Sequence, residues 1–210
     1  MSFQRARNEE QRAERRQAIL TTAQAMLADM PVAELSLNEL ARRVGLAKSN
    51  VLRYFGSREA VLLELLGDAC REWRAELERL PATDDASAVA SSVEARPVLC
   101  DLLAAQASVL ERNVSAEVAA RFKRAALADT IGLGRLVRGV IPELGEDAAA
   151  RFAAATVLVA GSLWAYCQPS PAMLAAYAAD PELAAMRMDF GAAVRDLLAT
   201  LLAGLLARPG

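Results

Sequence analysis

Apolar residues recur along nearly the whole chain at spacings of three and four, which is the period of an amphipathic helix. The apolar–polar alternation typical of strands does not stand out. Alanine and leucine, both strong helix formers, dominate the apolar positions, whereas β-branched residues are sparse. The pattern predicts an all-α protein, with an N-terminal three-helix domain that contains a helix-turn-helix, followed by a helical bundle.

The stretch from Leu35 to Arg58 predicts two short helices and a tight turn. Ser36 and Glu39 have the spacing of a capping box. The Ser36 hydroxyl would accept from the Glu39 N–H, and the Glu39 carboxylate would reach back to the Ser36 N–H. The first helix should therefore begin at Leu37. Gly45 should end it, because glycine enters the left-handed conformation without a Cβ penalty.

The second short helix is expected from Lys48 to Phe55, with Val51 and Phe55 buried. Its outward face is polar and consists of Lys48, Ser49, Asn50, Arg53 and Tyr54. Two helices joined by such a short turn form a helix-turn-helix. Helices of this length cannot bury a core alone, so a third is required. An earlier helix, from about Glu9 to Ala28, supplies an apolar stripe of Ile19, Ala23, Met26, Leu27 and Met30.

The rest of the pattern predicts a helical body, with nine or ten helices in the whole chain. Ser57 should cap a long helix from Arg58 to about Leu80. The small, polar segment Pro81–Ser92 is expected to be a loop. Later helices are expected at 97–113, at 115–138 with a break where two glycines lie between 129 and 134, at 146–167, at 172–179 and from about 181 to 207.

The 210 residues, 54% of them hydrophobic, suffice for two modest cores, and we expect domains at 1–56 and 57–210. Charge divides the chain in the same way. Residues 1–56 carry nine Lys or Arg and six Asp or Glu, a net charge of +3 within a chain of net charge −2. A basic segment on an acidic body favours a polyanionic partner at one end. The alternative is that these arginines only solvate a helix face.

Several classes of function have little support in the sequence. Histidine, the commonest general base and metal ligand, is absent. The three widely spaced cysteines form neither a zinc motif nor a disulfide framework, and we expect no metal and no cofactor. The longest apolar stretch, Phe152–Cys167, has sixteen residues and is short for a membrane span. Charges near the N-terminus do not fit a signal peptide, so we expect a cytoplasmic protein that does not bind membranes.

The first-helix stripe, the Leu-Ala-x-x-Val-Gly-Leu element, the Val-Leu-x-Tyr-Phe element and the Ser-Arg-Glu-Ala run together resemble the TetR family of bacterial transcriptional regulators. The resemblance covers about residues 10–66. It implies a homodimeric regulator, most commonly a repressor, that binds an operator in double-stranded DNA and responds to a small-molecule effector. The sequence departs from the family at Ala47, where many members carry a serine or threonine cap.

The resemblance places the second short helix in the major groove. The implied DNA-binding residues are Ser36, Asn38, Arg43, Lys48, Ser49, Asn50, Leu52, Arg53, Tyr54 and Arg58. Arg53 is the best candidate for a guanine edge, because its planar fork can donate to O6 and N7 together. Leu52 would either touch a thymine methyl group or be buried.

The other implied contacts divide between bases and the DNA backbone. Lys48 and Ser49 would reach base edges or phosphate, Asn50 phosphate or adenine, and Tyr54 phosphate. The backbone on either side would be held by Ser36, Asn38, Arg43 and Arg58, which position the protein without reading sequence. A mobile arm of Arg5, Arg7 and Arg12 could add a contact to phosphate or to the minor groove.

The helical body is expected to bind the effector and to form the dimer. Analogy with the family suggests an apolar effector site lined by Leu66, Cys70, Trp73, Leu103, Phe122 and Trp164. Each of these residues could instead be ordinary core. Phe152–Cys167 and Phe190–Leu206 are apolar on more than one face, which predicts a four-helix seam between two subunits.

Two alternative functions remain at this point. The chain could be a helical ligand-binding or scaffold protein that does not bind DNA. It could also be an enzyme that lacks histidine and uses carboxylates, but candidates such as Asp84 and Asp85 lie in an expected loop, where solvation explains them. We therefore expect that the protein is not an enzyme.

Overall fold

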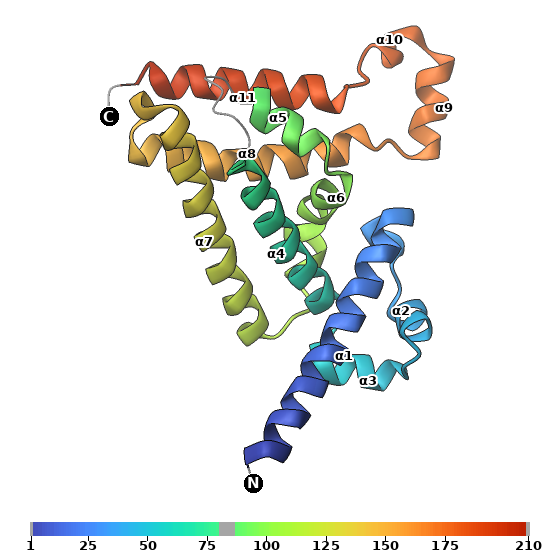
Figure 1. Cartoon of the computed structure of the whole chain (residues 1–210). Coiled ribbons are helices and arrows are strands. Elements are labelled where there is room, and N and C mark those ends of the chain that lie inside the picture. Colours follow the sequence, from blue (N-terminus) through green and yellow to red (C-terminus); the bar gives the residue numbers. More distant parts are fainter. Residues whose placement is uncertain (1, 80–86, 209–210) are drawn as a thin grey trace. The chain divides into compact units, whose positions relative to one another are not determined.

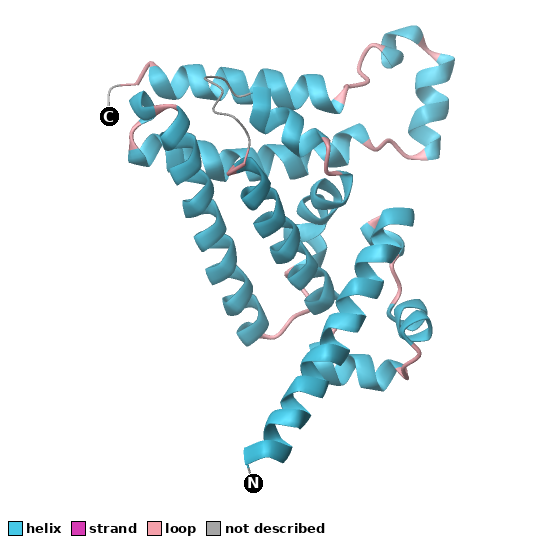
Figure 2. Cartoon of the chain, viewed as in Figure 1, coloured by secondary structure: helices cyan, strands magenta, loops and turns pink. Residues whose placement is uncertain are grey.

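The computed structural model describes residues 2–79 and 87–208, and every regular element in these ranges is a helix (Figure 1 and Figure 2). The all-α prediction is confirmed. The elements are α1 (Ser2–Asp29), η1 (Val32–Glu34), α2 (Leu37–Val44), α3 (Lys48–Phe55), α4 (Arg58–Leu77), α5 (Ser87–Glu94), α6 (Pro97–Ala105), the π-helical turn η2 (Gln106–Leu110), α7 (Ala116–Val140), η3 (Pro142–Leu144), α8 (Glu146–Cys167), α9 (Pro171–Ala179), α10 (Pro181–Ala184) and α11 (Phe190–Leu206).

The chain forms two compact units. The first contains Met1–Asp68 and Ala105–Phe122, and the second contains Ala69–Ala104 and Lys123–Gly210. This division falls inside α4, whereas the predicted domain boundary follows Gly56. That boundary stays a prediction.

The first unit packs α2 and α3 onto the apolar stripe of α1. Ile19, Ala23 and Met26 of that stripe are fully buried, as are Leu40 of α2 and Val51 of α3. These residues recur at helical spacing, so the burial follows from the sequence pattern. The helix-turn-helix therefore packs on a third helix, as predicted.

Arg16 of α1 links this helix to α3 and α4. Its guanidinium lies 4.1 Å from the centroid of the Phe55 ring and donates to the Tyr54 carbonyl oxygen at 2.8 Å. It also pairs with the carboxylate of Glu64 in α4. This arginine of the basic N-terminal segment therefore has a structural role.

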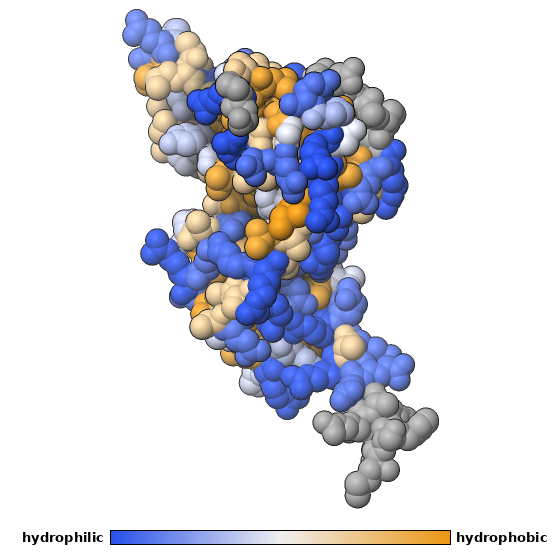
Figure 3. Space-filling model, turned by 90° about the vertical axis from the view of Figure 1, so that its left-hand side faces the viewer, coloured by the Kyte–Doolittle hydropathy of each residue, from blue (hydrophilic) through white to orange (hydrophobic). Residues whose placement is uncertain are grey.

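The second unit has its core between α5, α7, α8 and α11, with Phe152, Val194 and Leu198 at its centre. Helix α8 packs most extensively on α11. Among the described residues α8 is also the one helix long and apolar enough to cross a membrane by length and composition alone. Its face toward α11 is occupied by core contacts. On the face that Figure 3 presents, hydrophilic surface surrounds smaller apolar patches.

The structure corrects the expected loop at Pro81–Ser92. Residues 80–86 lie outside the described part of the chain, but Ser87–Glu94 forms α5. Ala90 and Val93 are buried, and the Ser92 hydroxyl accepts from the Trp73 indole N–H at 2.9 Å. Small residues that look loop-like allow this short helix to approach α11 closely, so tertiary packing outweighs local propensity.

The expected break in α7 is also wrong, because the helix runs without interruption through Gly132 and Gly134. A Cβ on Gly132 would lie 2.8 Å from Cδ of Arg74, and one on Gly134 would lie 3.3 Å from Cα of Ala150. These glycines therefore make room for neighbouring chains, and packing compensates for their low helix propensity.

Both ends of the chain also differ from expectation. The first helix begins at Ser2, so the backbone expected to form a mobile arm around Arg5 and Arg7 is helical. The single helix expected from about 181 to 207 is instead α10 and α11, separated by a turn. Asp189 caps α11 by accepting from the Ala192 N–H at 2.8 Å. A capping aspartate at this position favours a new helix start over continuation.

Candidate nucleic-acid interface

Helix α2 begins and ends where its sequence predicts. The Ser36 hydroxyl accepts from the Glu39 N–H at 3.1 Å, and Gly45 ends the helix with a left-handed φ of 74°. The Glu39 carboxylate does not complete the expected box. It accepts instead from Arg42, at 2.6 and 2.8 Å, and from Arg43 at 2.8 Å.

These hydrogen bonds from Arg42 and Arg43 lower the pKa of Glu39 from 4.5 to about 2. The carboxylate is therefore ionised throughout the physiological range. Arg43, an expected phosphate contact, is paired with this internal anion in the free protein. Ser36, which caps α2, and Asn38 in its first turn are both exposed.

Helix α3 presents a polar face to solvent, as its pattern predicts. It begins at Lys48 with Ala47 in the capping position, and Ala47 supplies no side-chain hydrogen bond. Lys48, Ser49 and Arg53 are exposed. The side chains at the other three predicted positions, Asn50, Leu52 and Tyr54, are half-buried.

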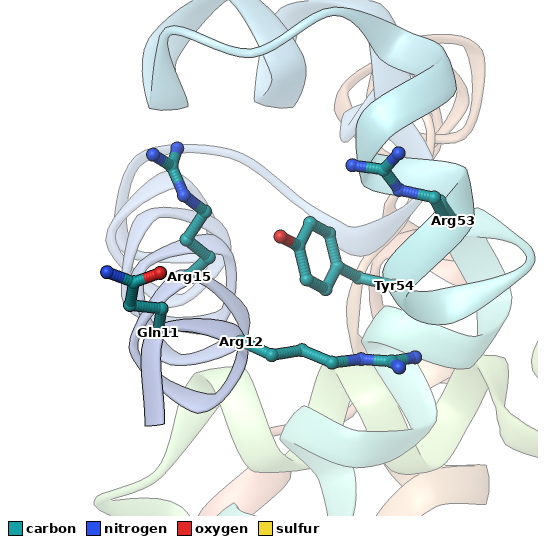
Figure 4. Close-up of a pocket in the computed structure, with 5 residues that line it drawn as sticks. All are labelled: Gln11, Arg12, Arg15, Arg53 and Tyr54. Atoms are coloured by element: carbon teal, nitrogen blue, oxygen red, sulfur yellow. The ribbon is translucent and has the colours of Figure 1, made fainter. Parts of the chain in front are cut away.

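A concave pocket of about 320 Å³ lies between α1 and α3. It is lined by Gln11, Arg12, Arg15, Arg53 and Tyr54. Figure 4 shows Tyr54 projecting from α3 toward α1, while Arg12 projects from α1 toward α3. Three guanidinium groups and a phenol around one hollow form a donor-rich, cationic surface suited to phosphate oxygens.

This pocket extends the predicted interface onto α1. The sequence did not single out Gln11 and Arg15 as site residues. The signal was available, because Gln11, Arg12 and Arg15 lie at spacings of three and four and therefore share one face of α1. Of the three arginines expected in a mobile N-terminal segment, Arg12 lies at the pocket on a regular helix. The side chains of Arg5 and Arg7 lie outside the described residues.

Arg58 differs from the other predicted contacts because its guanidinium is turned inward. Its Nε donates to the Leu35 carbonyl oxygen at 2.5 Å, and an Nη donates to the Val32 carbonyl oxygen. It also lies 3.4 Å from the Glu59 carboxylate, and its side chain is only 19% exposed. These bonds tie the start of α4 to the segment before α2. They favour a structural role over the expected phosphate contact.

The predicted effector-binding residues divide between the two units. Leu66 and Phe122, both buried, belong to the first unit, whereas Cys70, Trp73, Leu103 and Trp164 belong to the second. Trp73 and Leu103 are buried, and Trp164 is half-buried with its ring edge-on to Phe190 at 5.1 Å. The effector site stays a prediction.

The three cysteines are free thiols, and we expect them to react slowly. Burial raises the pKa of Cys70 and of Cys100 from 9.0 to about 12. Cys100 is buried, whereas Cys70 and Cys167 are half-buried. Within the described part of the chain, no group of three or more Cys, Asp or Glu residues could hold a metal ion.

Comparisons with known protein families agree with this geometry. Residues 19–65 match the family described as "Bacterial regulatory proteins, tetR family". Residues 61–209, more than half of the chain, match the domain described as "Tetracyclin repressor-like, C-terminal domain". The two matches together include α2, α3 and the whole helical body.

Individual relatives are similar over a shorter stretch. The HTH-type transcriptional regulator EthR of Mycobacterium tuberculosis is 45% identical over 53 residues, which is 25% of this chain and 24% of that protein. The EthR of Mycolicibacterium smegmatis is 43% identical over the same length. The matched segment therefore spans about a quarter of the relatives' own length.

Proposed function

The chain belongs to the TetR family of bacterial transcriptional regulators, and we propose that it is a homodimeric repressor whose binding to its operator is changed by a small, mostly apolar molecule. Regulators of this family bind DNA and are not enzymes, so family membership removes the support for a carboxylate enzyme or a scaffold without DNA binding. The cytoplasm is the compartment in which such a regulator meets DNA.

The observation that carries the DNA-binding proposal is the cationic surface shared by α1 and α3. Helix α3 has eight residues, about 12 Å of helix, and a major groove about 12 Å wide admits it. In this proposal the exposed Arg53 donates to a guanine edge. Arg12 and Arg15 hold phosphates beside the groove, where contacts position the protein without reading sequence.

An unpartnered apolar stripe on α8 and α11 supports the dimer. Leu158 and Tyr166 of α8 are 70% and 76% exposed, and Leu197 of α11 is 43% exposed. Ala154 and Ser162 are small exposed residues that alternate with Leu158 and Tyr166 at four-residue spacing on α8, and they permit close helix contact. Exposed apolar surface of this kind on packed helices is typical of a subunit interface.

For the effector we propose a site within the second unit, among Cys70, Trp73, Leu103 and Trp164. These side chains offer mainly apolar and aromatic surface, and the raised pKa of Cys70 leaves its thiol uncharged. Binding would shift the population of body conformations and so change the separation of the two α3 helices from about 34–36 Å, one turn of DNA. Release of DNA would then relieve repression.

The DNA-binding proposal is tested with two duplexes, one from the region upstream of the chain's own coding sequence and one of shuffled sequence. Loss of a bidentate base contact costs about 1–3 kcal/mol, or about 5- to 150-fold in affinity. Arg53→Ala should lose this factor mainly on the upstream duplex. Arg12→Ala should weaken both duplexes alike, and Arg135→Ala, an exposed arginine on α7, serves as the charge-matched control.

Fluorescence anisotropy over a series of salt concentrations measures these affinities. If Arg53→Ala weakened both duplexes equally, the base contact would be wrong. Transcription in vitro from the same upstream region tests the repressor assignment, because a repressor must lower transcript yield as protein is added.

A further inference from the structure

The segment from Gln168 to Asp189 leaves the end of α8, forms α9 and α10, and returns to the start of α11 (Figure 1). We call this segment the arm. Its base is closed by Trp164, near the end of α8, and Phe190, the first residue of α11, whose rings meet edge to face at 5.1 Å. The aromatic pair holds the two ends of the arm together, so the arm begins and ends at the same place on the second unit.

The arm is apolar, yet its side chains lie on the surface. Met173, Leu174, Leu183, Met186 and Met188 are 45%, 43%, 38%, 68% and 42% exposed. Neither α9 nor α10 has a buried residue, and α9 contains no charged residue. No arm residue belongs to the core cluster of the second unit.

The helices of the arm are nevertheless specified by their sequence. The Ser170 hydroxyl accepts from the Met173 N–H at 3.3 Å, and the Asp180 carboxylate accepts from the Glu182 N–H at 2.8 Å. Proline occupies the first helical position in both cases. Isolated helices shorter than about 12–15 residues are marginal in water. Helices of nine and four residues that contact each other therefore still need a further surface to pack on.

We propose that the arm packs against a second copy of this chain, as a clasp beside the seam of α8 and α11. The inference rests on the dimer put forward under Proposed function. The arm connects the C-terminal end of one proposed seam helix to the N-terminal end of the other, so its apolar surface continues that of the seam. The arm carries one basic residue, Arg187, and three acidic ones, Asp180, Glu182 and Asp189. This excess of negative charge makes nucleic acid a poor occupant.

Three single substitutions at matched exposure separate the arm, the seam and the remaining surface. Met186→Glu changes the arm at a position 68% exposed, Leu158→Glu changes the seam at 70%, and Leu127→Glu changes α7 at 62%. Each side chain is exposed in a single subunit, so none of these changes should prevent folding. Analytical ultracentrifugation of the full chain gives the dimer dissociation constant for each.

We expect Met186→Glu and Leu158→Glu each to raise the dimer dissociation constant about tenfold or more, because a carboxylate would be buried against apolar surface. Leu127→Glu should leave it unchanged. Hydrogen exchange should show amides of α9 protected in the dimer, and this protection should be lost on dilution to monomer or in Met186→Glu.

The outcomes distinguish the two proposals. A wild-type chain that stays monomeric at micromolar concentration would overturn the dimer and the arm contact together. A stable dimer that Leu158→Glu dissociates, but in which Met186→Glu has no effect and α9 exchanges freely, would leave the seam intact and overturn the arm contact alone.

Discussion

Arg58 provides a sharp test of how the helix-turn-helix is held, because its structure and its sequence motif suggest different roles. Substitution by methionine keeps a long aliphatic stem and removes every donor. Two carbonyl oxygens, those of Val32 and Leu35, then lose a charged donor in a segment whose side chains are 2% and 1% exposed.

The size of the effect follows from these contacts. A hydrogen bond from a charged donor contributes about 1.5–3 kcal/mol, so two would give about 3–6 kcal/mol. The Arg58 side chain is 19% exposed, and water can replace part of what is lost. We therefore expect Arg58→Met to lower the free energy of unfolding by about 2–4 kcal/mol, a large fraction of the ~5–15 kcal/mol typical of a folded protein.

Urea unfolding followed by far-UV circular dichroism measures this loss. With a slope of about 2 kcal/mol per molar urea, the midpoint should fall by about 1–2 M. Arg53→Met is the control, because Arg53 is exposed and its removal should change DNA affinity but hardly move the midpoint. An unchanged midpoint for Arg58→Met, with equal weakening on all duplexes, would refute the structural role and restore the phosphate contact.

Three further predictions concern stability and thiol chemistry. Ala47→Ser should raise the free energy of unfolding by about 1 kcal/mol in thermal or urea unfolding, because it gives α3 the missing cap; no gain would mean that the serine does not reach the helix N–H groups. Gly161→Ala should lower the free energy of unfolding by about 1–3 kcal/mol, because its Cβ would lie 2.9 Å from the Leu103 carbonyl carbon. The control Gly139→Ala places its Cβ in open space and should raise the free energy of unfolding, so equal effects would contradict the packing of α6 on α8. Cys70 should resist alkylation by iodoacetamide at pH 9 in the native chain, and labelling as fast as in urea, measured by mass spectrometry, would show the thiol to be accessible. The free energy of unfolding should also fall as pH rises from about 9 toward 12, because only the unfolded chain ionises the Cys70 thiol in that range.

The sequence predicts the helix-turn-helix closely because the signals that determine it are local. Ser36, Gly45 and Ser57 each act on a backbone group within three or four residues, and all three occupy the positions expected of them. The apolar stripe of α1 is equally local, because helical spacing alone places Ile19 and Met26 on one face.

The errors concern residues whose role depends on distant parts of the chain. Gly132 suggests a broken helix until Arg74 of α4 is seen to occupy the space beside it. Ser87–Glu94 suggests a loop until α11 is available to pack against it. Arg58 belongs to a motif associated with DNA, but its hydrogen bonds reach back more than twenty residues. None of these partners is marked by local spacing.

The bond between Glu39 and the arginines of α2 has a consequence for how salt affects DNA binding. In most protein–DNA complexes, each phosphate neutralised by a cation releases condensed ions from the DNA, and the salt slope counts these pairs. Arg42 and Arg43 are already hydrogen-bonded to an anion of the same helix, Glu39, which stays ionised because its pKa is about 2. If Arg42 and Arg43 stay paired with Glu39 when the protein binds its operator, α2 will contribute less to the salt slope than its two arginines suggest. Glu39→Gln should therefore make DNA affinity fall more steeply with salt without adding a cationic side chain to the protein.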